Sequence, residues 1–244
     1  MIIFYHKCNI YSYFVIVLSY SYLMGRKVTR LASKIWNPVF TKQLKTAQKF
    51  AYFMVLDFEA TCERDKKIEA PEIIEFPVLM VNPSTFRIEA NFHQYVKPTV
   101  NPQLSDFCTE LTGIIQDMVE DQPDLPTVLK MFDSFLREKN LNVHPSKFAF
   151  VTCGDWDLKT MLPVQCKQLG IDVPDYFKQW INLKQVYCDV MGQFPQSMMS
   201  MLSDLKLKHV GRHHSGIDDC TNIANILCEL IRKGATPEYT GKSR

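Results

Sequence analysis

The stretch Phe53-Met54-Val55-Leu56-Asp57-Phe58-Glu59-Ala60-Thr61-Cys62 decides the fold, because an almost wholly apolar run ends abruptly in two carboxylates one residue apart. Side chains alternate between the faces of a strand, so Asp57 and Glu59 are predicted to point to the same side. Apolar residues up to Leu56 predict a central strand that is covered on both faces, where unpaired charge is unfavourable. The two acids therefore need a partner at the end of this strand.

A hard divalent cation such as Mg²⁺ or Mn²⁺ is one natural partner, because it prefers carboxylate oxygens as ligands. The alternative is that the acids end the strand at the surface and pair there with Lys66 or Lys67. This stretch alone leaves both interpretations open, and residues further along the chain must decide.

The length of 244 residues is enough for one domain of ordinary size with an extension. A formal net charge of +2 argues against a protein that coats long duplexes, so any nucleic-acid binding must use a local basic patch. The eight cysteines form no CxxC pair, which favours free thiols in a reducing compartment over a disulfide framework or a zinc site.

We expect three segments, an N-terminal extension over 1–50, a folded domain over 51–234 and a tail over 235–244. The apolar run over 10–24 is 15 residues long, and a membrane-spanning helix needs about 20. It is similar to a signal-peptide core, and a translation start nearer Met24 or a poorly ordered extension are alternatives of at least equal weight. We therefore expect a cytoplasmic or nuclear protein without a stable membrane partner, with a targeting signal left open.

The hydrophobic pattern predicts strands that are followed by alternating helices and strands, which is typical of an α/β fold. The predicted strands cover 52–59, 72–81, 86–96, 147–152 and 180–183. Helices are expected over 125–139, from Gly154 onward, in pieces between 184 and 205, and over 217–232. Residues 98–121 are expected to be mostly loop with a short helix.

Further acids stand where apolar elements end. In Cys153-Gly154-Asp155-Trp156-Asp157, we expect the Asp155 side chain to cap the following helix, which leaves Asp157 free for chemistry. The alternative for Asp157 is a favourable position in the field of the helix N-terminus.

The segment Gly211-Arg212-His213-His214-Ser215-Gly216-Ile217-Asp218-Asp219-Cys220 offers two histidine–aspartate pairs with the same spacing. At about 100° per residue, Asp219 shares a helix face with the apolar residues of 223–230, whereas Asp218 groups with Asn222, Asn225 and Glu229 on a polar face. Asp219 is therefore predicted to point inward, where it needs a partner or a metal. By the shared offset His214 is its better mate, and His213 is expected to be a solvated neighbour or a phosphate contact.

With these residues in view, the chain resembles the DEDDh family of 3′-to-5′ exonucleases, in the branch of the histone-mRNA 3′ exonuclease and the enhanced-RNAi and prion-protein-interacting exonucleases. The resemblance covers nearly all of 52–233. It is carried by LDFEATC (56–62), EIIEFP (72–77), LTGI (111–114), CGDWDLK (153–159), QWINLKQ (179–185) and GRHHSGIDDCTNIA (211–224). It implies a ribonuclease H-like fold, with a five-stranded mixed sheet flanked by helices.

The resemblance also implies two Mg²⁺ ions, or Mn²⁺, held by Asp57, Glu59, Asp157 and Asp219. Asp57 would bridge both ions, Glu59 and Asp219 would complete one, and Asp157 would support the other. His214 would take the proton from the attacking water. The implied reaction removes nucleoside 5′-monophosphates from the 3′ end of RNA.

The expected substrate is RNA with a single-stranded 3′ end or a short overhang. The backbone of Ala60, Thr61 and Cys62 is expected to hold the terminal 3′-hydroxyl, and Leu111 and Thr112 to wedge between the last bases. Trp156 is expected either to stack on a terminal base or to be a core or helix-staple aromatic. Arg212 and Lys208 are candidate phosphate contacts. Two rivals stay open, a DNA exonuclease and a catalytically silent RNA-binding or scaffold protein of the same fold.

Overall fold

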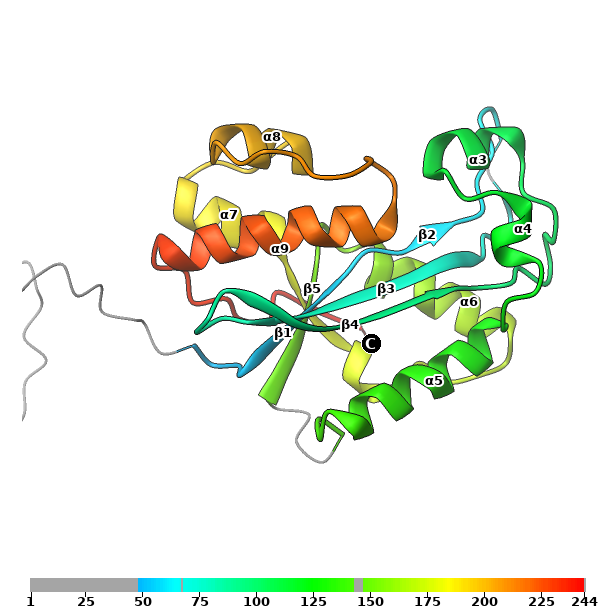
Figure 1. Ribbon diagram of the computed structural model, residues 1–244, viewed down its shortest axis with the longest axis horizontal. Coiled ribbons are helices and arrows are strands. Elements are labelled where there is room, and N and C mark those ends of the chain that lie inside the picture. The colour runs from blue at the N-terminus through cyan, green and yellow to red at the C-terminus, as the bar shows by residue number, and fades with distance from the viewer. Residues whose placement is uncertain (1–47, 67, 143–146, 244) are drawn as a thin grey trace, which may run out of the picture. The chain divides into compact units, whose positions relative to one another are not determined.

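Strand β1 (Tyr52–Leu56) lies inside the sheet, parallel to β5 (Phe148–Thr152) and antiparallel to β3 (Ile73–Asn82) (Figure 1). The computed structural model describes residues 48–66, 68–142 and 147–243. The expectations for the N-terminal extension before residue 48 lie outside these ranges. The central position predicted for the first strand is confirmed.

The sheet is completed by β4 (Arg87–Tyr95), antiparallel to β3, and by β6 (Gln179–Asn182), parallel to β5. Two short strands extend it beyond the five that were expected. These are β2 (Glu59–Ala60) beside β3 and β7 (Gly241–Lys242) beside β6. The mixed sheet flanked by helices is confirmed, but it has seven strands among the described residues. The two extra strands could not be predicted, because two residues are too few to show an alternating pattern.

The predicted strand over 52–59 is interrupted where its acids begin. The backbone N–H of Phe58 donates to Asp157 Oδ1 at 2.9 Å and so leaves the ladder of the sheet. Pairing resumes in β2, with a register shift between Glu59 and Ala60. The break places Asp57 and Phe58 between the two strands, and Glu59 begins β2.

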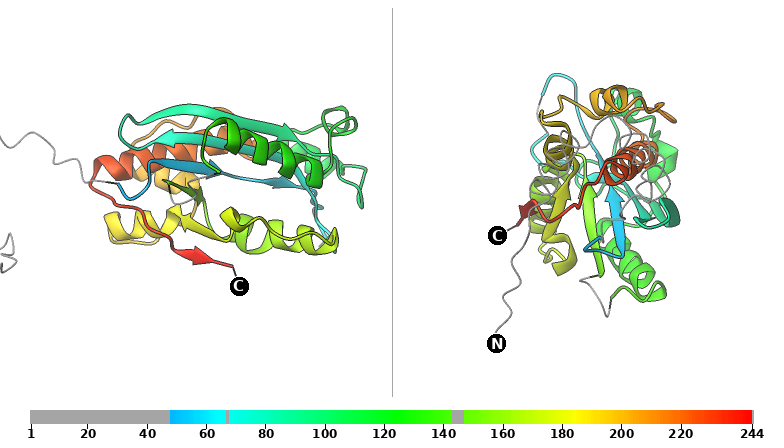
Figure 2. Two further views of the ribbon diagram at one scale, coloured as in Figure 1. Left: turned by 90° about the horizontal axis from the view of Figure 1, so that it is seen from below. Right: turned by 90° about the vertical axis from the view of Figure 1, so that its left-hand side faces the viewer.

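Helices cover both faces of the sheet (Figures 1 and 2). Phe53 and Val55 pack on the side of α7 (Leu183–Met191), α8 (Met198–Asp204) and α9 (Gly216–Arg232). Met54 and Leu56 pack on the other side, against α5 (Leu125–Glu138) and α6 (Leu162–Gln168). The two-sided burial predicted for β1 is therefore confirmed.

The remaining elements are short. Residues 98–121 contain α3 (Asp106–Thr112) and α4 (Gln116–Val119), a π-helical turn (Asp157–Met161) leads into α6, and a 3₁₀ turn (Asp175–Phe177) precedes β6. The seven cysteines among the described residues are all free, in agreement with the expectation from their spacing.

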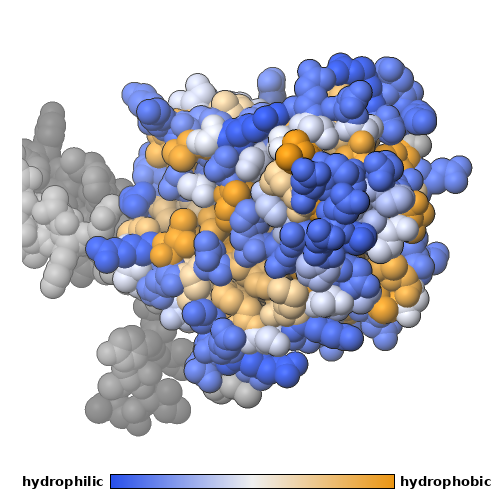
Figure 3. All heavy atoms as spheres, turned by 45° about the vertical axis from the view of Figure 1, so that its right-hand side comes forward, coloured by the Kyte–Doolittle hydropathy of each residue, from blue (hydrophilic) through white to orange (hydrophobic). Residues whose placement is uncertain are grey.

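Within the described ranges, no helix is long and apolar enough to cross a membrane. The face shown in Figure 3 is largely hydrophilic, with apolar residues in separate groups.

Candidate active site

Three of the predicted acids converge at the end of β1. One carboxylate oxygen from each of Asp57, Glu59 and Asp219 lies within 4.8 Å of the other two. Glu59 is 9 % exposed and Asp219 is 3 % exposed. The inward direction of Asp219 is confirmed, and the alternative of surface acids paired with lysine does not fit this burial.

Asp157 stands beside this group on the π-helical turn and is 5 % exposed. The N–H of Phe58, between the first two acids, fixes its Oδ1. That bond links the carboxyl end of β1 to the start of the helix after β5. Because β1 and β5 are parallel neighbours, their ends meet at one edge of the sheet.

Burial raises the pKa of three acids in this group, and neighbouring charges add to the effect at two of them. Burial, followed by the charge of Asp157, raises the pKa of Asp57 well above its usual value. Burial and the charge of Glu75 raise the pKa of Glu59 to about 9. Burial raises the pKa of Asp157 to about 6, against the lowering effect of the Phe58 N–H bond. Such a set resists full ionisation until a cation neutralises it.

The loop over 209–215 is here called the histidine loop, and two side chains of α9 hold its backbone. Asn222 accepts from Val210 N–H at 3.0 Å and donates to Val210 O at 2.8 Å. Asp218 accepts from the N–H of Arg212 at 2.8 Å. Asp218 is therefore a loop anchor. Asn222 was predicted to lie on a polar face, and this prediction is wrong because the residue is fully buried. Its side chain satisfies the backbone N–H and C=O of Val210 in the loop.

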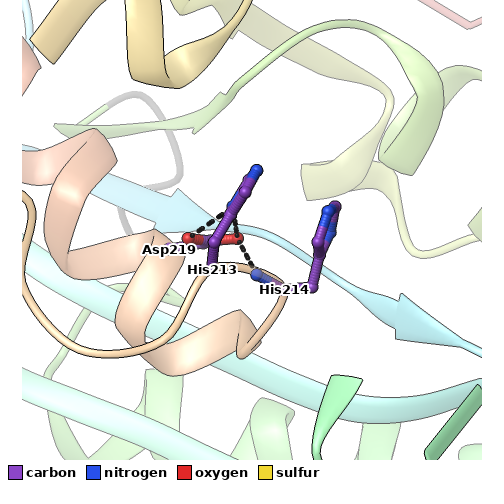
Figure 4. Close-up of side chains that lie close together, drawn as sticks. All are labelled: His213, His214 and Asp219. Atoms are coloured by element: carbon purple, nitrogen blue, oxygen red, sulfur yellow. Dashed lines mark hydrogen bonds and ion pairs between the residues drawn. The ribbon is translucent and has the colours of Figure 1, made fainter. Parts of the chain in front are cut away.

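Both histidines contact Asp219, but through different groups (Figure 4). The Nδ1 of His213 lies 3.1 Å from Oδ2 of Asp219, and the backbone N–H of His214 donates to that oxygen at 2.9 Å. His214 adopts a left-handed backbone with φ of 65°, a conformation that is uncommon outside glycine. The expectation of a merely solvated His213 is wrong, because its exposed ring also contacts the inward acid.

The two imidazole rings lie parallel, with centroids 4.0 Å apart and planes inclined by 19°. Burial and the neighbouring His213 lower the pKa of His214. His214 therefore tends to be neutral near pH 7, the form in which an imidazole accepts a proton.

A cavity of about 220 Å³ opens beside these residues. Its lining combines Asp57, Asp219 and both histidines with a cation, Lys184, from the first turn of α7. The cavity gives a small ligand direct access to the converging acids.

Arg212 connects the histidine loop to α3. Its guanidinium donates to the carbonyl of Glu110 and, at 3.5 Å, to that of Leu111. A Cβ on Gly113, the left-handed residue that ends α3, would stand 3.0 Å from the guanidinium. Arg212 thus satisfies carbonyls at the C-terminus of α3, a contact favoured by their partial negative charge.

The other residues expected to bind substrate differ in exposure and in their hydrogen bonds. Leu111 and Ala60 are partly exposed, whereas Thr112 is 2 % exposed and its hydroxyl bonds to Cys108 O and Ile114 N. Thr61 N–H donates to Glu72 O at 2.8 Å, and the carbonyl of Cys62 accepts from Ser105. The backbone N–H of Thr61 and the hydroxyl of Thr112 are therefore already hydrogen-bonded within the protein.

Trp156 is 48 % exposed, which excludes the core alternative for this side chain. The prediction that the Asp155 side chain caps the helix is wrong. Asp155 O accepts from Lys159 N–H, as in a helix start, but the carboxylate instead accepts from Trp180 Nε1 at 2.8 Å and Asn182 Nδ2 at 3.1 Å. Asp155 thereby ties the end of β5 to β6.

The donor chemistry of the converging acids fits a hard divalent cation. Three carboxylates converge here, and burial together with neighbouring charges raises the pKa of Asp57 and Glu59, a cost that a bound cation relieves. His213, His214 and Asp219 form a second group with ligand atoms within 4.8 Å of one another. Asp219 belongs to both groups and joins them.

Two residues of this region were not singled out from the sequence. Glu75 is 1 % exposed and lies behind the acids on β3, and Lys184 lines the cavity. Glu75 had a usable signal, because it is the one charged residue in the apolar run IIEFPVLMV over 73–81. Lys184 had none, since a lysine in the first turn of a helix is usually solvated.

Comparisons with known proteins agree with this geometry. A family model described as Exonuclease (RNase_T) matches residues 54–227. The human protein named ERI1 exoribonuclease 3 is 54 % identical over 196 residues, which are 80 % of this chain and 58 % of that protein. The Drosophila melanogaster 3′-5′ exonuclease Snipper is 39 % identical over 202 residues, 77 % of this chain and 72 % of that one.

Among solved structures, the nuclease domain of 3′hExo, described as a DEDDh family member bound to rAMP, superimposes with a TM-score of 0.77 at 38 % identity. The match covers 80 % of this chain and all of that domain. The expected ribonuclease H-like fold is confirmed by this likeness. The chain spans somewhat more than half the length of the human relative.

Proposed function

Because the chain belongs to the exonuclease family, as a DEDDh member of the branch that the sequence resembles, we propose that it is a 3′-to-5′ exoribonuclease. It hydrolyses phosphodiester bonds from RNA 3′ ends and releases nucleoside 5′-monophosphates. Enzymes of this family depend on divalent metal ions, and we propose two Mg²⁺ here, with Mn²⁺ as a substitute.

The convergence of Asp57, Glu59 and Asp219 within 4.8 Å carries this proposal. Bound cations would supply positive charge for the developing negative charge on phosphorus and would lower the pKa of a water molecule. Asp57, Glu59 and Asp219 would hold them, and Asp157 would support the site from the neighbouring helix turn. The Phe58 N–H keeps Asp157 oriented for that role.

We assign the general base to His214. Its lowered pKa keeps the ring neutral and able to accept a proton from water near pH 7. The bond from its backbone to Asp219 fixes the loop relative to the acids. His213, whose ring contacts Asp219 directly, is the alternative that the geometry raises.

RNA is the proposed substrate because the human relative is named an exoribonuclease and the 3′hExo domain is bound to rAMP. The exposed Trp156 is available to stack on a base, and Lys184 to contact a phosphate in the cavity. A single-stranded 3′ end or a short overhang fits a site that opens at one edge of the sheet.

Parallel degradation of RNA and DNA oligomers of one sequence, in Mg²⁺, tests the substrate. We expect faster shortening of RNA from its 3′ end, and faster shortening of DNA would favour the DNA exonuclease instead. The matched control is Asp57→Ala, which should remain folded and inactive. Binding of RNA without any cleavage by the unmodified protein would favour the catalytically silent scaffold.

A further inference from the structure

Glu75 is a buried carboxylate that the proposed reaction does not use. It lies on β3, is 1 % exposed, and makes three bonds through its two oxygens. Oε2 accepts from Gly216 N–H at 2.9 Å, and Oε1 accepts from Ile217 N–H at 3.1 Å. Oε1 also lies 2.8 Å from Nε2 of His93 on β4.

Two of these bonds hold the start of α9. The first N–H groups of a helix have no partner within the helix, and they carry its partial positive charge. Ser215, which precedes α9, makes no side-chain capping bond. Glu75 therefore does from the neighbouring strand what a capping side chain does locally, over a separation of 141 residues to Gly216.

The start of α9 also lies very close to the end of β1. A Cβ on Gly216 would stand 2.8 Å from Asp57 O, 3.0 Å from Pro77 Cγ and 3.1 Å from Glu75 Oε2. Glycine allows the helix to approach the backbone of Asp57 to this distance. The start of α9 is thus held by close contact with the end of β1 and by the bonds to Glu75.

Asp219 lies in the first turn of this helix, and its N–H donates to Ser215 O at 2.8 Å. A change in the position of that turn moves the Asp219 carboxylate relative to Asp57 and Glu59. It also moves the histidine loop, because the backbone of His214 bonds to Asp219. The anchored first turn of α9 therefore determines the position of the Asp219 carboxylate, which belongs to both groups of candidate ligands.

We propose that Glu75 is a positioning residue that anchors the N-terminus of α9 and thereby places Asp219 in the cation site. This inference rests on the proposed function, since it concerns the same site. His93 supports Glu75 from the far side, on a strand that carries none of the candidate ligands.

The test is Glu75→Gln, which keeps the size of the side chain but turns one acceptor into a donor facing an N–H group. Glu72→Gln is the matched control. Glu72 is also 1 % exposed and accepts backbone N–H groups, at 2.6 Å from Thr99 and 2.9 Å from Val100, but it does not contact α9. Circular dichroism would establish that both variants are folded.

The first readout is Mg²⁺ affinity, measured by calorimetry and by the rise in Tm with Mg²⁺, without RNA. We expect Glu75→Gln to weaken Mg²⁺ binding by about 10- to 100-fold, the range seen when supports of metal ligands are removed. Glu72→Gln should bind Mg²⁺ as the unmodified protein does. The second readout is kinetic, and we expect Glu75→Gln to need more Mg²⁺ for half-maximal rate at an unchanged KM for RNA.

If Glu75 only supported folding, Glu75→Gln would lower the folded fraction and reduce the rate in proportion. The Mg²⁺ concentration needed for half-maximal rate would not change. Unchanged Mg²⁺ affinity in folded Glu75→Gln, or an equal loss in Glu72→Gln, would overturn the inference while the proposed function stands. An unmodified protein that binds Mg²⁺ but does not cleave RNA would overturn the proposed function. The role of Glu75 would then be decided by the Mg²⁺ affinities of the two variants alone. If the unmodified protein bound no divalent cation, both would fall.

Discussion

Replacing Glu59 by glutamine should stabilise the metal-free protein although it removes a candidate metal ligand. Burial and the nearby acids raise the pKa of Glu59 from 4.5 to about 9. Above pH 4.5 the unfolded chain releases a proton that the folded protein keeps. The contribution of Glu59 to the free energy of unfolding is therefore greatest below pH 4.5 and decreases as the pH rises towards 9.

The size of the effect follows from this pKa difference. One linked proton changes the free energy of unfolding by about 1.36 kcal/mol per pH unit. Between pH 5.5 and 7.5, the metal-free protein should therefore lose about 2.7 kcal/mol through this group. Glu59→Gln cannot ionise, so it should be more stable than the unmodified protein at pH 7.5, by up to about 4 kcal/mol.

Urea unfolding in EDTA at pH 5.5, 6.5 and 7.5 measures this prediction, with Glu120→Gln as a control at an exposed acid. Adding Mg²⁺ should stabilise the unmodified protein, and more so at higher pH, because a cation binds the ionised carboxylates. Glu59→Gln should lose most of that gain. A metal-free stability that does not change with pH, or a less stable Glu59→Gln protein at pH 7.5, would refute the reasoning.

Three further outcomes follow from the site. Asp57→Ala and Asp219→Ala should each abolish Mg²⁺-dependent removal of 3′ nucleotides while circular dichroism remains unchanged; retained activity would contradict the ligand assignment. His214→Ala should lower kcat by about 10²- to 10⁴-fold and leave calorimetric Mg²⁺ binding intact, whereas His213→Ala should have the smaller effect; the reverse order would make His213 the base. Arg212→Ala frees α3 from the histidine loop and should raise KM for RNA about tenfold, near 1.4 kcal/mol, and an unchanged KM would refute this coupling.

Much of the site could be predicted because its residues interrupt strong local patterns. Asp57 and Glu59 follow an apolar strand, and helical periodicity separates the inward Asp219 from Asp218. These signals depend on a few neighbouring residues. They identify which acids face the interior before any long-range contact is known.

The features that were predicted wrongly from the sequence depend on contacts between distant segments. Asp155 was expected to cap its own helix, but Trp180 and Asn182 bind its carboxylate across the sheet. Asn222 has a polar side chain, yet it is buried because it serves the backbone of Val210. Such partners are set by the packing of elements, which sequence periodicity does not describe.

The histidine assignment shows the same limit. Equal spacing to the two aspartates left His213 and His214 interchangeable until the helix face selected Asp219. The structure then brings both to Asp219, one by its ring and one by its backbone. His214 adopts a left-handed backbone in this arrangement, and no local pattern in the sequence indicates it.

The most direct test of the account identifies the products formed from a single-stranded RNA labelled at its 5′ end. Incubation with Mg²⁺ should give a ladder that shortens from the 3′ end, together with nucleoside 5′-monophosphates identified by chromatography. EDTA or Asp57→Ala should prevent both. Internal cleavage, products that carry 3′-phosphates, or intact RNA in the presence of either Mg²⁺ or Mn²⁺ would contradict the proposed 3′-to-5′ exoribonuclease.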